Sequence, residues 1–336
     1  MTRDHRLTWI DIAAIATLCA LTLLFYRGIA LSNQILPGVD AFTYFYPYRA
    51  YAAQAIREGQ IPLWNPYLFL GVPFVANAQS AVFYPLNLAL AALPAPKLVA
   101  WSIVLHVALG AALAYLYARL VLRASPLPAL LGASAFALGG FLSGQVEHIN
   151  QLNVSAWFPL LLLLWELRRR ARWPALLGLG VTIGLGLLAG HAQSTYISAA
   201  GLGVYALLPH LIEGVRALQG RVPWRPALRQ LGTTLLHLAL AGLLGAALAA
   251  VQLVPTLELS GRSIRGGGLS YREVVAFSLK PLPRLLRYTF LPPWGGNLAQ
   301  VYGGSFFTEY LAYVGLIPLL LAGLGAGAGL LWFRRQ

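Results

Sequence analysis

The chain contains 336 residues, of which 58% are hydrophobic and only 10% are charged. A soluble domain of this length could not solvate so apolar a surface, so the composition predicts an integral membrane protein. Lys and Arg outnumber Asp and Glu by 24 to 10. Because these basic residues lie between apolar segments, they indicate a membrane topology and contact with anionic lipid, not a partner made of nucleic acid. The single cysteine excludes a disulfide framework and a cysteine-based zinc site.

Apolar segments of helical length recur along the whole chain. A bilayer core of about 30 Å requires roughly 20 helical residues, and this length predicts an all-α bundle of about eight transmembrane helices. The N-terminal stretch begins basic and turns apolar without a convincing small-residue cleavage site, so we expect an uncleaved first span. We expect one domain over 1–336, with spans near 9–31, 97–122, 127–144, 152–167, 174–190, 194–213, 231–254 and 309–333.

Arginines cluster in every second connection, which predicts the orientation of the bundle. By the positive-inside rule these connections and the N-terminus lie inside, whereas 32–96, 144–151, 190–193 and 255–308 lie outside. The two long segments are a first outer loop, 32–96, and a last outer loop, 255–308. The inner arginines are Arg3, Arg6, Arg119, Arg123, Arg168, Arg169, Arg170, Arg172, Arg216, Arg221, Arg225, Arg229, Arg334 and Arg335.

The first outer loop opens with a turn and a helix. Pro37 and Gly38 allow a sharp turn, after which Asp40 is suited to cap a helix that ends before Gly59. Pro47 would be tolerated in the first turn of this helix and would kink it if it lay deeper. The helix mixes aromatic residues with Arg49, a pattern typical of a helix in the lipid headgroup layer.

The rest of this loop is too rich in Pro and Gly for one regular helix. Such backbone is tolerated near a bilayer where protein or a wet cavity satisfies its polar groups. Aromatic rings and amides are also the groups with which proteins stack on sugars and hydrogen-bond their hydroxyls. An interfacial aromatic belt is the alternative explanation for Trp64 and Tyr84. The aromatic and amide residues of this stretch are Trp64, Asn65, Asn77, Gln79, Tyr84 and Asn87.

Several stretches together resemble a known family. They are PLWNPY, LGVPF and AQSAVFYPLN in the first outer loop, followed by GFLSGQVEHINQLNVSAWFPLLLLLWE, LAGHAQSTYIS, AAVQLVPTLELSGRS and YREVVAFSLKPLPRLLRYTFLPPWGG. The chain is similar over nearly its whole length to the YfhO-type bacterial membrane proteins, which are grouped with the GT-C glycosyltransferases. Relatives are usually longer, so the resemblance implies a fragment or a shortened form.

The resemblance implies a polytopic enzyme of the bacterial cytoplasmic membrane. Such an enzyme transfers a sugar from a polyprenyl-phosphate carrier to an acceptor outside, such as a cell-wall polymer or a glycolipid. Asp40 matches the place of the essential acid in the first outer loop of GT-C enzymes. Many relatives have a paired acidic motif, but Gly38-Val39-Asp40 offers one carboxylate. A divalent metal cofactor therefore stays open, without support from a paired acidic motif.

The proposed chemistry needs a base and a positive group. Asp40 is suited to take the proton of the acceptor hydroxyl, and one carboxylate suffices for an inverting displacement. The departing phosphate needs cations, and arginine binds phosphate through two donors. We expect these cations in the last outer loop, with Arg49 and His148 as weaker candidates. The loop cations are Arg262, Arg265, Lys280, Arg284 and Arg287.

Each candidate also has a purely structural explanation. Asp40 could serve only as a helix cap. Glu147 and His148 are adjacent, and a solvated polar turn explains them better than a metal site. His191 and Gln193 end a span, where packing is as good an explanation as substrate contact. Glu258 and Arg262 are spaced as a helical ion pair.

Two other functional classes stay open from the sequence. A transporter or lipid flippase would fit glycine-interrupted spans such as GLGVTIGLGLLAG and the mid-span residues His106 and His237. The acids, however, cluster at the predicted span ends, which argues against transport. A catalytically silent membrane scaffold is the third class.

Overall fold

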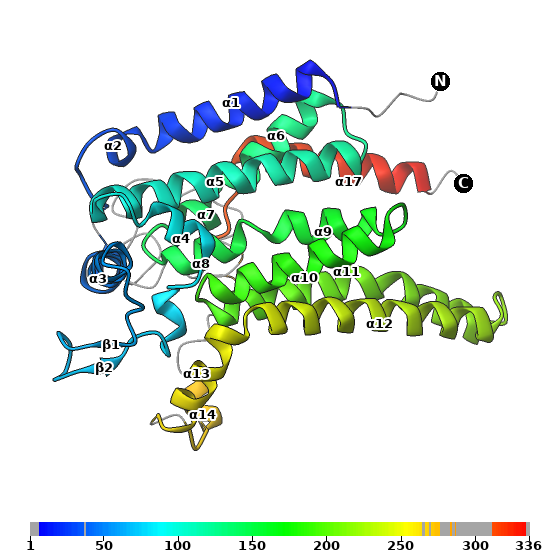
Figure 1. Cartoon of the computed structure of the whole chain (residues 1–336). Helices are drawn as coiled ribbons and strands as arrows, with labels where there is room; N and C mark the ends of the chain where they lie inside the picture. The colour runs from blue at the N-terminus through cyan, green and yellow to red at the C-terminus, as the bar shows by residue number, and fades with distance from the viewer. Residues whose placement is uncertain are drawn as a thin grey trace.

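The computed structural model describes residues 7–36, 38–263, 266–268, 270–275, 283, 286 and 311–333. This part of the chain is mostly helical, as predicted, and forms an elongated bundle (Figure 1). The helices that precede residue 95 in the chain are α1 (Trp9–Phe25), α2 (Arg27–Ala30), the π-helix η1 (Ala41–Phe45), α3 (Tyr46–Arg57), the 3₁₀-helix η2 (Ala78–Ser80) and α4 (Pro85–Leu90).

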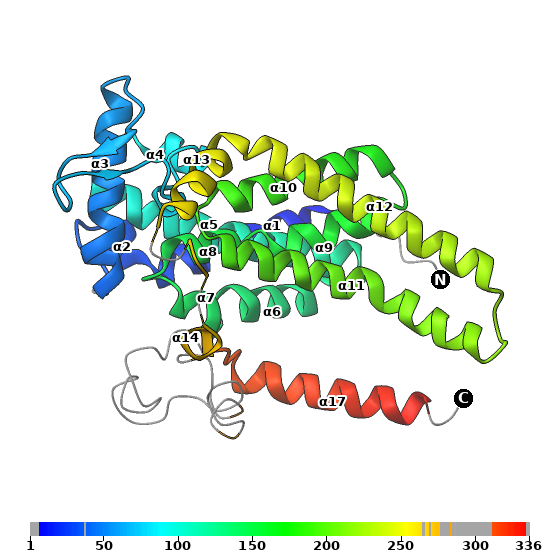
Figure 2. The same cartoon turned by 90° about the horizontal axis from the view of Figure 1, so that it is seen from below.

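The bundle itself is built from the helices that follow. They are α5 (Ala95–Leu120), α6 (Pro126–Ala137), α7 (Gly140–Gly144), α8 (Ile149–Ser155), α9 (Phe158–Leu167), α10 (Arg172–Leu188), α11 (Ala192–Leu218), α12 (Trp224–Leu248), α13 (Ala250–Gly261), α14 (Tyr271–Val275) and α17 (Leu316–Phe333). In the view from below, α17 lies along one side of the bundle (Figure 2).

Within the described residues, four helical stretches are long and apolar enough to cross a membrane. They are α5, α6 together with α7, α11 and α12, and they identify the chain as a membrane protein. The apolar helices α1, α10 and α17 are shorter. The predicted span 152–167 is divided between α8 and α9, with a break at Ala156 and Trp157. The total of eight spans therefore stays a prediction.

Helix α5 is the central element, because it packs against α1, α6, α8 and α9. Its residues Ile103 and Val107 belong to the same buried apolar core as Leu18 of α1 and Ala133 of α6. A second core joins α9, α10, α11 and α12 around Trp165. Two adjoining apolar cores thus run along the bundle.

Glycines bring α10 and α12 close together. A Cβ on Gly245 would lie 3.0 Å from the carbonyl oxygen of Gly180, and one on Gly184 would lie 3.2 Å from that of Gly245. Small residues allow this close approach between helices in a bilayer. The glycine-rich sequence of α10 therefore produces a packing face on an unbroken helix, although the sequence suggested an interrupted span.

The loop segment between α2 and α5 contains the only strands of the described chain. Strands β1 (Trp64–Asn65) and β2 (Val72–Pro73) pair antiparallel, with Trp64 opposite Pro73. Gly59 has φ +73° and follows the C-cap residue Glu58 of α3, as the predicted C-terminal position requires. The π-helix η1 ends at Phe45, and Pro47 lies in the first turn of α3, where its missing N–H is tolerated.

A buried ion pair joins α1 to the far end of α5. Asp11 is 1% exposed and accepts hydrogen bonds from the Arg119 guanidinium and, at 2.7 Å, from the Tyr115 hydroxyl. Its other oxygen accepts from the backbone N–H of Thr8 at 2.7 Å, which closes a capping box at the start of α1.

We expect Asp11→Asn to destabilise the bundle by roughly 3 kcal/mol, because it leaves the Arg119 charge without its carboxylate. Thermal unfolding of the purified chain in detergent measures this change. Glu58→Gln, which alters an exposed acid at the end of α3, is the matched control and should leave the midpoint unchanged. Equal midpoints for all three proteins would contradict this prediction.

Candidate functional site

Asp40 lies at one end of the bundle, which we call the Asp40 end. Its backbone is helical, with φ −71° and ψ −37°, and its side chain makes no capping hydrogen bond. The predicted capping role is therefore absent, because the residue already lies within the first helical turn. The carboxylate is 53% exposed, and its Oδ2 lies 3.2 Å from Nε2 of His148.

His148 belongs to the short segment between α7 and α8. Its Nδ1 lies 2.9 Å from Oε1 of Gln145, whose side chain is buried. The ring is thus held between two oxygens, one from Gln145 and one from Asp40. Glu147 lies against Gly38, where an added Cβ would come within 2.9 Å of the Glu147 carboxylate. A glycine before Asp40 therefore lets this turn approach closely.

Arg49 and Asn150 hold the segments of the site together. The buried Arg49 guanidinium donates to the backbone carbonyl of Ser80 and to the side-chain carbonyl of Asn150. The Asn150 amide donates to the carbonyls of Gln79 at 2.8 Å and Gly190 at 3.3 Å. Burial lowers the pKa of Arg49 to about 10, so it stays charged at neutral pH.

Gly190 makes this arrangement sterically possible. Its φ is +88°, and an added Cβ would lie 2.5 Å from the carbonyl oxygen of Ala78 and 2.8 Å from Nδ2 of Asn150. Only glycine fits a position that combines a left-handed backbone with such close neighbours. The next residue, His191, is thereby placed near the other site residues.

His191 caps α11 and borders an amphipathic pocket of about 600 Å³. Its Nδ1 accepts a hydrogen bond from the backbone N–H of Ser194 at 3.1 Å. Gln193 and Gln151 contribute further polar groups, and the apolar wall consists of Phe136, Phe141, Phe158 and Ile197. The pocket therefore offers a polar end and an apolar wall to one ligand.

The aromatic and amide candidates of the first loop segment do not all reach this site. Trp64 is about half exposed, and its ring lies on Gly71 within the hairpin. Asn65 is buried and accepts from the N–H of Tyr67 at 3.0 Å. The Gln79 side chain is exposed, and only its backbone joins the Asn150 network.

Tyr84 is fully buried in a hydrogen-bonded chain that does not include Asp40. Its hydroxyl accepts from the indole N–H of Trp157 at 2.8 Å and lies 2.7 Å from Nε2 of His106. Nδ1 of His106 lies 2.6 Å from the carbonyl of Ser102, which can only accept, so Nδ1 carries the proton. Nε2 therefore accepts from Tyr84, and all three side chains are satisfied.

The predicted cations of the last outer loop are only partly described. Arg262 lies 2.8 Å from Glu258 across one helical turn, and both side chains are more than 60% exposed. This geometry is that of the surface ion pair that the spacing also suggested. Arg265, Lys280, Arg284 and Arg287 lie outside the described residues.

Gln145, Asn150 and Gly190 help to form the site but were not predicted from the sequence. Gln145 precedes His148 by three residues and Asn150 follows it by two, in a stretch quoted for its family resemblance. An amide is a common residue type, so its burial and its partners were needed to assign a role. The sequence offered one indication, Gly190 directly before His191, because a glycine often marks a backbone conformation that other residues avoid.

Comparisons of this chain with protein-family models, curated proteins and solved structures gave no match. Among the described residues, no group of three or more His, Cys, Asp or Glu side chains is arranged to hold a metal ion. The candidate site therefore rests on its own geometry: the Asp40–His148 pair, the Arg49–Asn150 network and the His191 pocket.

We expect His191 to make stability depend on pH. Burial, and secondarily the charge of His148, lower the pKa of His191. As the pH falls below about 6.5, the unfolded chain takes up a proton that the folded chain resists, so stability decreases. His191→Asn retains a side-chain acceptor for the Ser194 N–H and removes this titration. Thermal midpoints between about pH 7 and pH 5 should fall less steeply for the variant; an unchanged slope would refute the assignment.

Proposed function

We propose that this chain is a membrane glycosyltransferase that moves a sugar from a polyprenyl-phosphate carrier to an extracytoplasmic acceptor. One observation carries the proposal: an exposed carboxylate, Asp40, is paired with His148 near a pocket that has a polar end and an apolar wall. The sequence resemblance to GT-C glycosyltransferases supports the same assignment for Asp40.

In the proposed reaction, Asp40 acts as the general base. An oxygen of the acceptor hydroxyl attacks the anomeric carbon of the sugar and passes its proton to the Asp40 carboxylate. The bond between the anomeric carbon and the phosphate oxygen breaks, and its electron pair leaves with the phosphate. This single displacement inverts the anomeric carbon. His148 is a positioning residue, because its ring contacts the carboxylate and fixes its direction.

The pocket beside His191 is suited to the lipid-linked donor. Phe136, Phe141 and Phe158 offer an apolar wall to a polyprenyl chain, and Gln193 and Gln151 offer hydrogen-bond donors to a phosphate. The N-terminus of α11 adds the positive end of a long helix dipole at this place. The donor phosphate would then lie at the polar end of the pocket, towards Asp40.

The proposal also includes an orientation. The Asp40 end faces the outside of a bacterial cytoplasmic membrane, and the arginine-rich connections face the cytoplasm. The acceptor, a cell-wall polymer or a glycolipid, would approach from the exposed side of Asp40. Membrane lipids surround α11 and α12, because only 17% of the most apolar stretch of each helix is buried within the protein.

Transport receives less support from the contacts inside the bundle. His106, a mid-helix ionisable residue, has both ring nitrogens engaged by Tyr84 and Ser102. Such a satisfied, fully buried group serves packing between helices. The unbroken α10 likewise lacks the interruption that a midplane substrate site uses.

Asp40→Asn should lower the rate of sugar transfer by about 10²- to 10⁴-fold, because the amide keeps the shape of the side chain and cannot take the proton. The assay uses the chain reconstituted in liposomes with polyprenyl-phosphate-linked sugars and follows labelled sugar into lipid or polymer acceptors. Glu58→Gln is the matched control and should transfer like the native chain, since Glu58 is an exposed acid at the far end of α3.

Equal activity of the Asn variant and the native chain would move the chemistry away from Asp40. Absence of transfer by a well-folded native chain with every donor offered would favour the scaffold function.

A further inference from the structure

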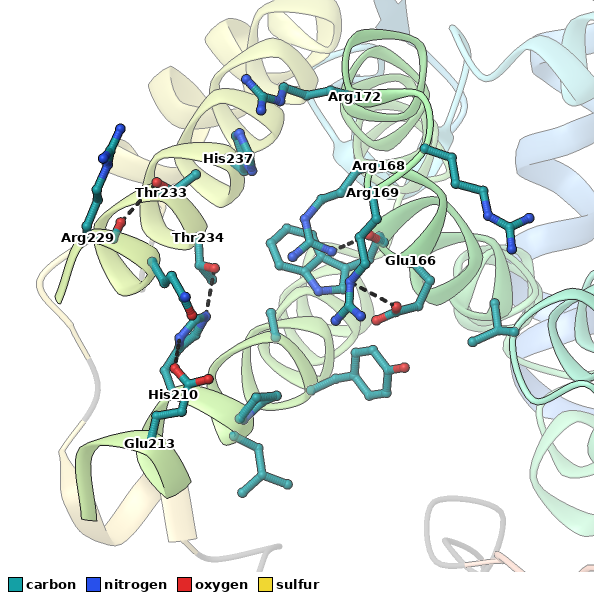
Figure 3. Close-up of a pocket in the computed structure, with 18 of the residues that line it drawn as sticks. Glu166, Arg168, Arg169, Arg172, His210, Glu213, Arg229, Thr233, Thr234 and His237 are labelled. Atoms are coloured by element: carbon teal, nitrogen blue, oxygen red, sulfur yellow. Dashed lines mark hydrogen bonds and ion pairs between the residues drawn. The ribbon is translucent and has the colours of Figure 1, made fainter. Parts of the chain in front are cut away.

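The opposite end of the bundle, which we call the arginine end, contains a cavity of about 1090 Å³. It lies between α9 and α10 on one side and α11 and α12 on the other. Figure 3 shows Arg168 at one wall, facing His210 and Thr234 across the opening. The site proposed for glycosyl transfer uses none of these residues, so this cavity requires a separate explanation.

The charges around this cavity are unbalanced. Five arginines line it, Arg168, Arg169, Arg170, Arg172 and Arg229, against the two carboxylates of Glu166 and Glu213. Both carboxylates already have a neighbour. Glu166 lies 3.4 Å from Arg169, and Glu213 lies 3.6 Å from Nδ1 of His210.

Arg172 and Arg229 have no acidic partner within ion-pair distance in the described part of the chain. The cavity therefore has an excess of positive charge that the described acids do not neutralise.

Arg168 is held rigidly inside this charged wall. Its guanidinium carbon lies 3.3 Å from the centre of the Trp165 ring, and it donates to the backbone carbonyl of Trp165. Burial lowers the pKa of Arg168 to about 10, so the group is charged at neutral pH although it is partly removed from water. A fixed, partly desolvated guanidinium of this kind binds a phosphate oxygen pair well.

The remaining wall of the cavity has an apolar part and a polar part. Leu122 and Leu208 line it and are themselves 62% and 52% exposed, in a bundle whose outer surface faces lipid. Thr234 is buried and engages Nε2 of His210 at 2.8 Å, which fixes the polar side. A ligand with one anionic head and one apolar part matches this lining.

We propose that the cavity at the arginine end binds a phosphate group, carried by an anionic lipid or by a soluble phosphate compound. The apolar wall fits the acyl region of a lipid, and the arginines fit its head group. This proposal is independent of the glycosyltransferase proposal, because it uses the other end of the bundle.

The test measures lipid retention by the full chain in detergent, using native mass spectrometry. Phosphatidylglycerol and phosphatidylcholine with the same acyl chains are the two lipid probes, and inorganic phosphate, followed by thermal stabilisation, is the soluble probe. The variant Arg172→Gln/Arg229→Gln removes two exposed charges whose side chains form no hydrogen bond or ion pair with the described residues. Arg216→Gln/Arg221→Gln is the matched control, because these exposed arginines lie outside the cavity.

For a lipid ligand, the native chain and the control should prefer phosphatidylglycerol, and the cavity variant should bind it roughly 10- to 30-fold more weakly. Arg168→Gln should weaken binding in the same direction. For a soluble ligand, inorganic phosphate should stabilise the native chain and not the cavity variant, with no lipid preference. The proposal would be overturned if the native chain and the cavity variant bound phosphatidylglycerol equally and were stabilised equally by inorganic phosphate. An equal loss of binding in the control variant would also overturn it.

Discussion

The Arg49 guanidinium, enclosed between α3, η2 and α8, is the contact on which the Asp40 end depends. It links α3, which follows Asp40 and η1 in the chain, to the carbonyl of Ser80 and to Asn150, two residues after His148. Through Asn150 the same contact reaches Gly190, which precedes His191. One buried charge thus fixes three segments that are distant in the sequence, and leaving its partners unpaired would be costly in this environment.

The two ends of the bundle use ionisable groups in opposite ways. At the Asp40 end, the charged Arg49 is fully enclosed and serves position, whereas Asp40 itself is open to a reactant. At the arginine end, the charges surround an open cavity and outnumber their acidic partners. Between the ends, polar side chains of α5 such as Ser102 and His106 are hydrogen-bonded within the protein. The proposed chemistry and the proposed phosphate binding therefore lie at the two ends of the bundle, and the hydrogen-bonded interior of α5 takes part in neither.

The sequence predicted the features that depend on local composition. The length of the apolar segments predicted a helical membrane protein, and Gly59 predicted the end of α3. The four-residue spacing of Glu258 and Arg262 predicted their ion pair. The contact of Asp40 with His148 could not be predicted, because it depends on how two distant turns pack. Arg49 and Tyr84 were candidates for ligand contact, since neither residue type reveals from sequence whether it will be enclosed. The Asn150 network was missed for the same reason.

The central position of α5 has a consequence for the biosynthesis of this protein. Of the most apolar stretch of α5, 67% is buried within the protein. The polar side chain of Ser102 in this helix is paired with Asn153 of α8. The partners of α5 are made at different times. His106 and Arg119 pair with Tyr84 and Asp11, which precede α5 in the chain, whereas Ser102 pairs with Asn153, which follows it. The polar contacts of this central helix can therefore be completed only after the chain has been synthesised through α8.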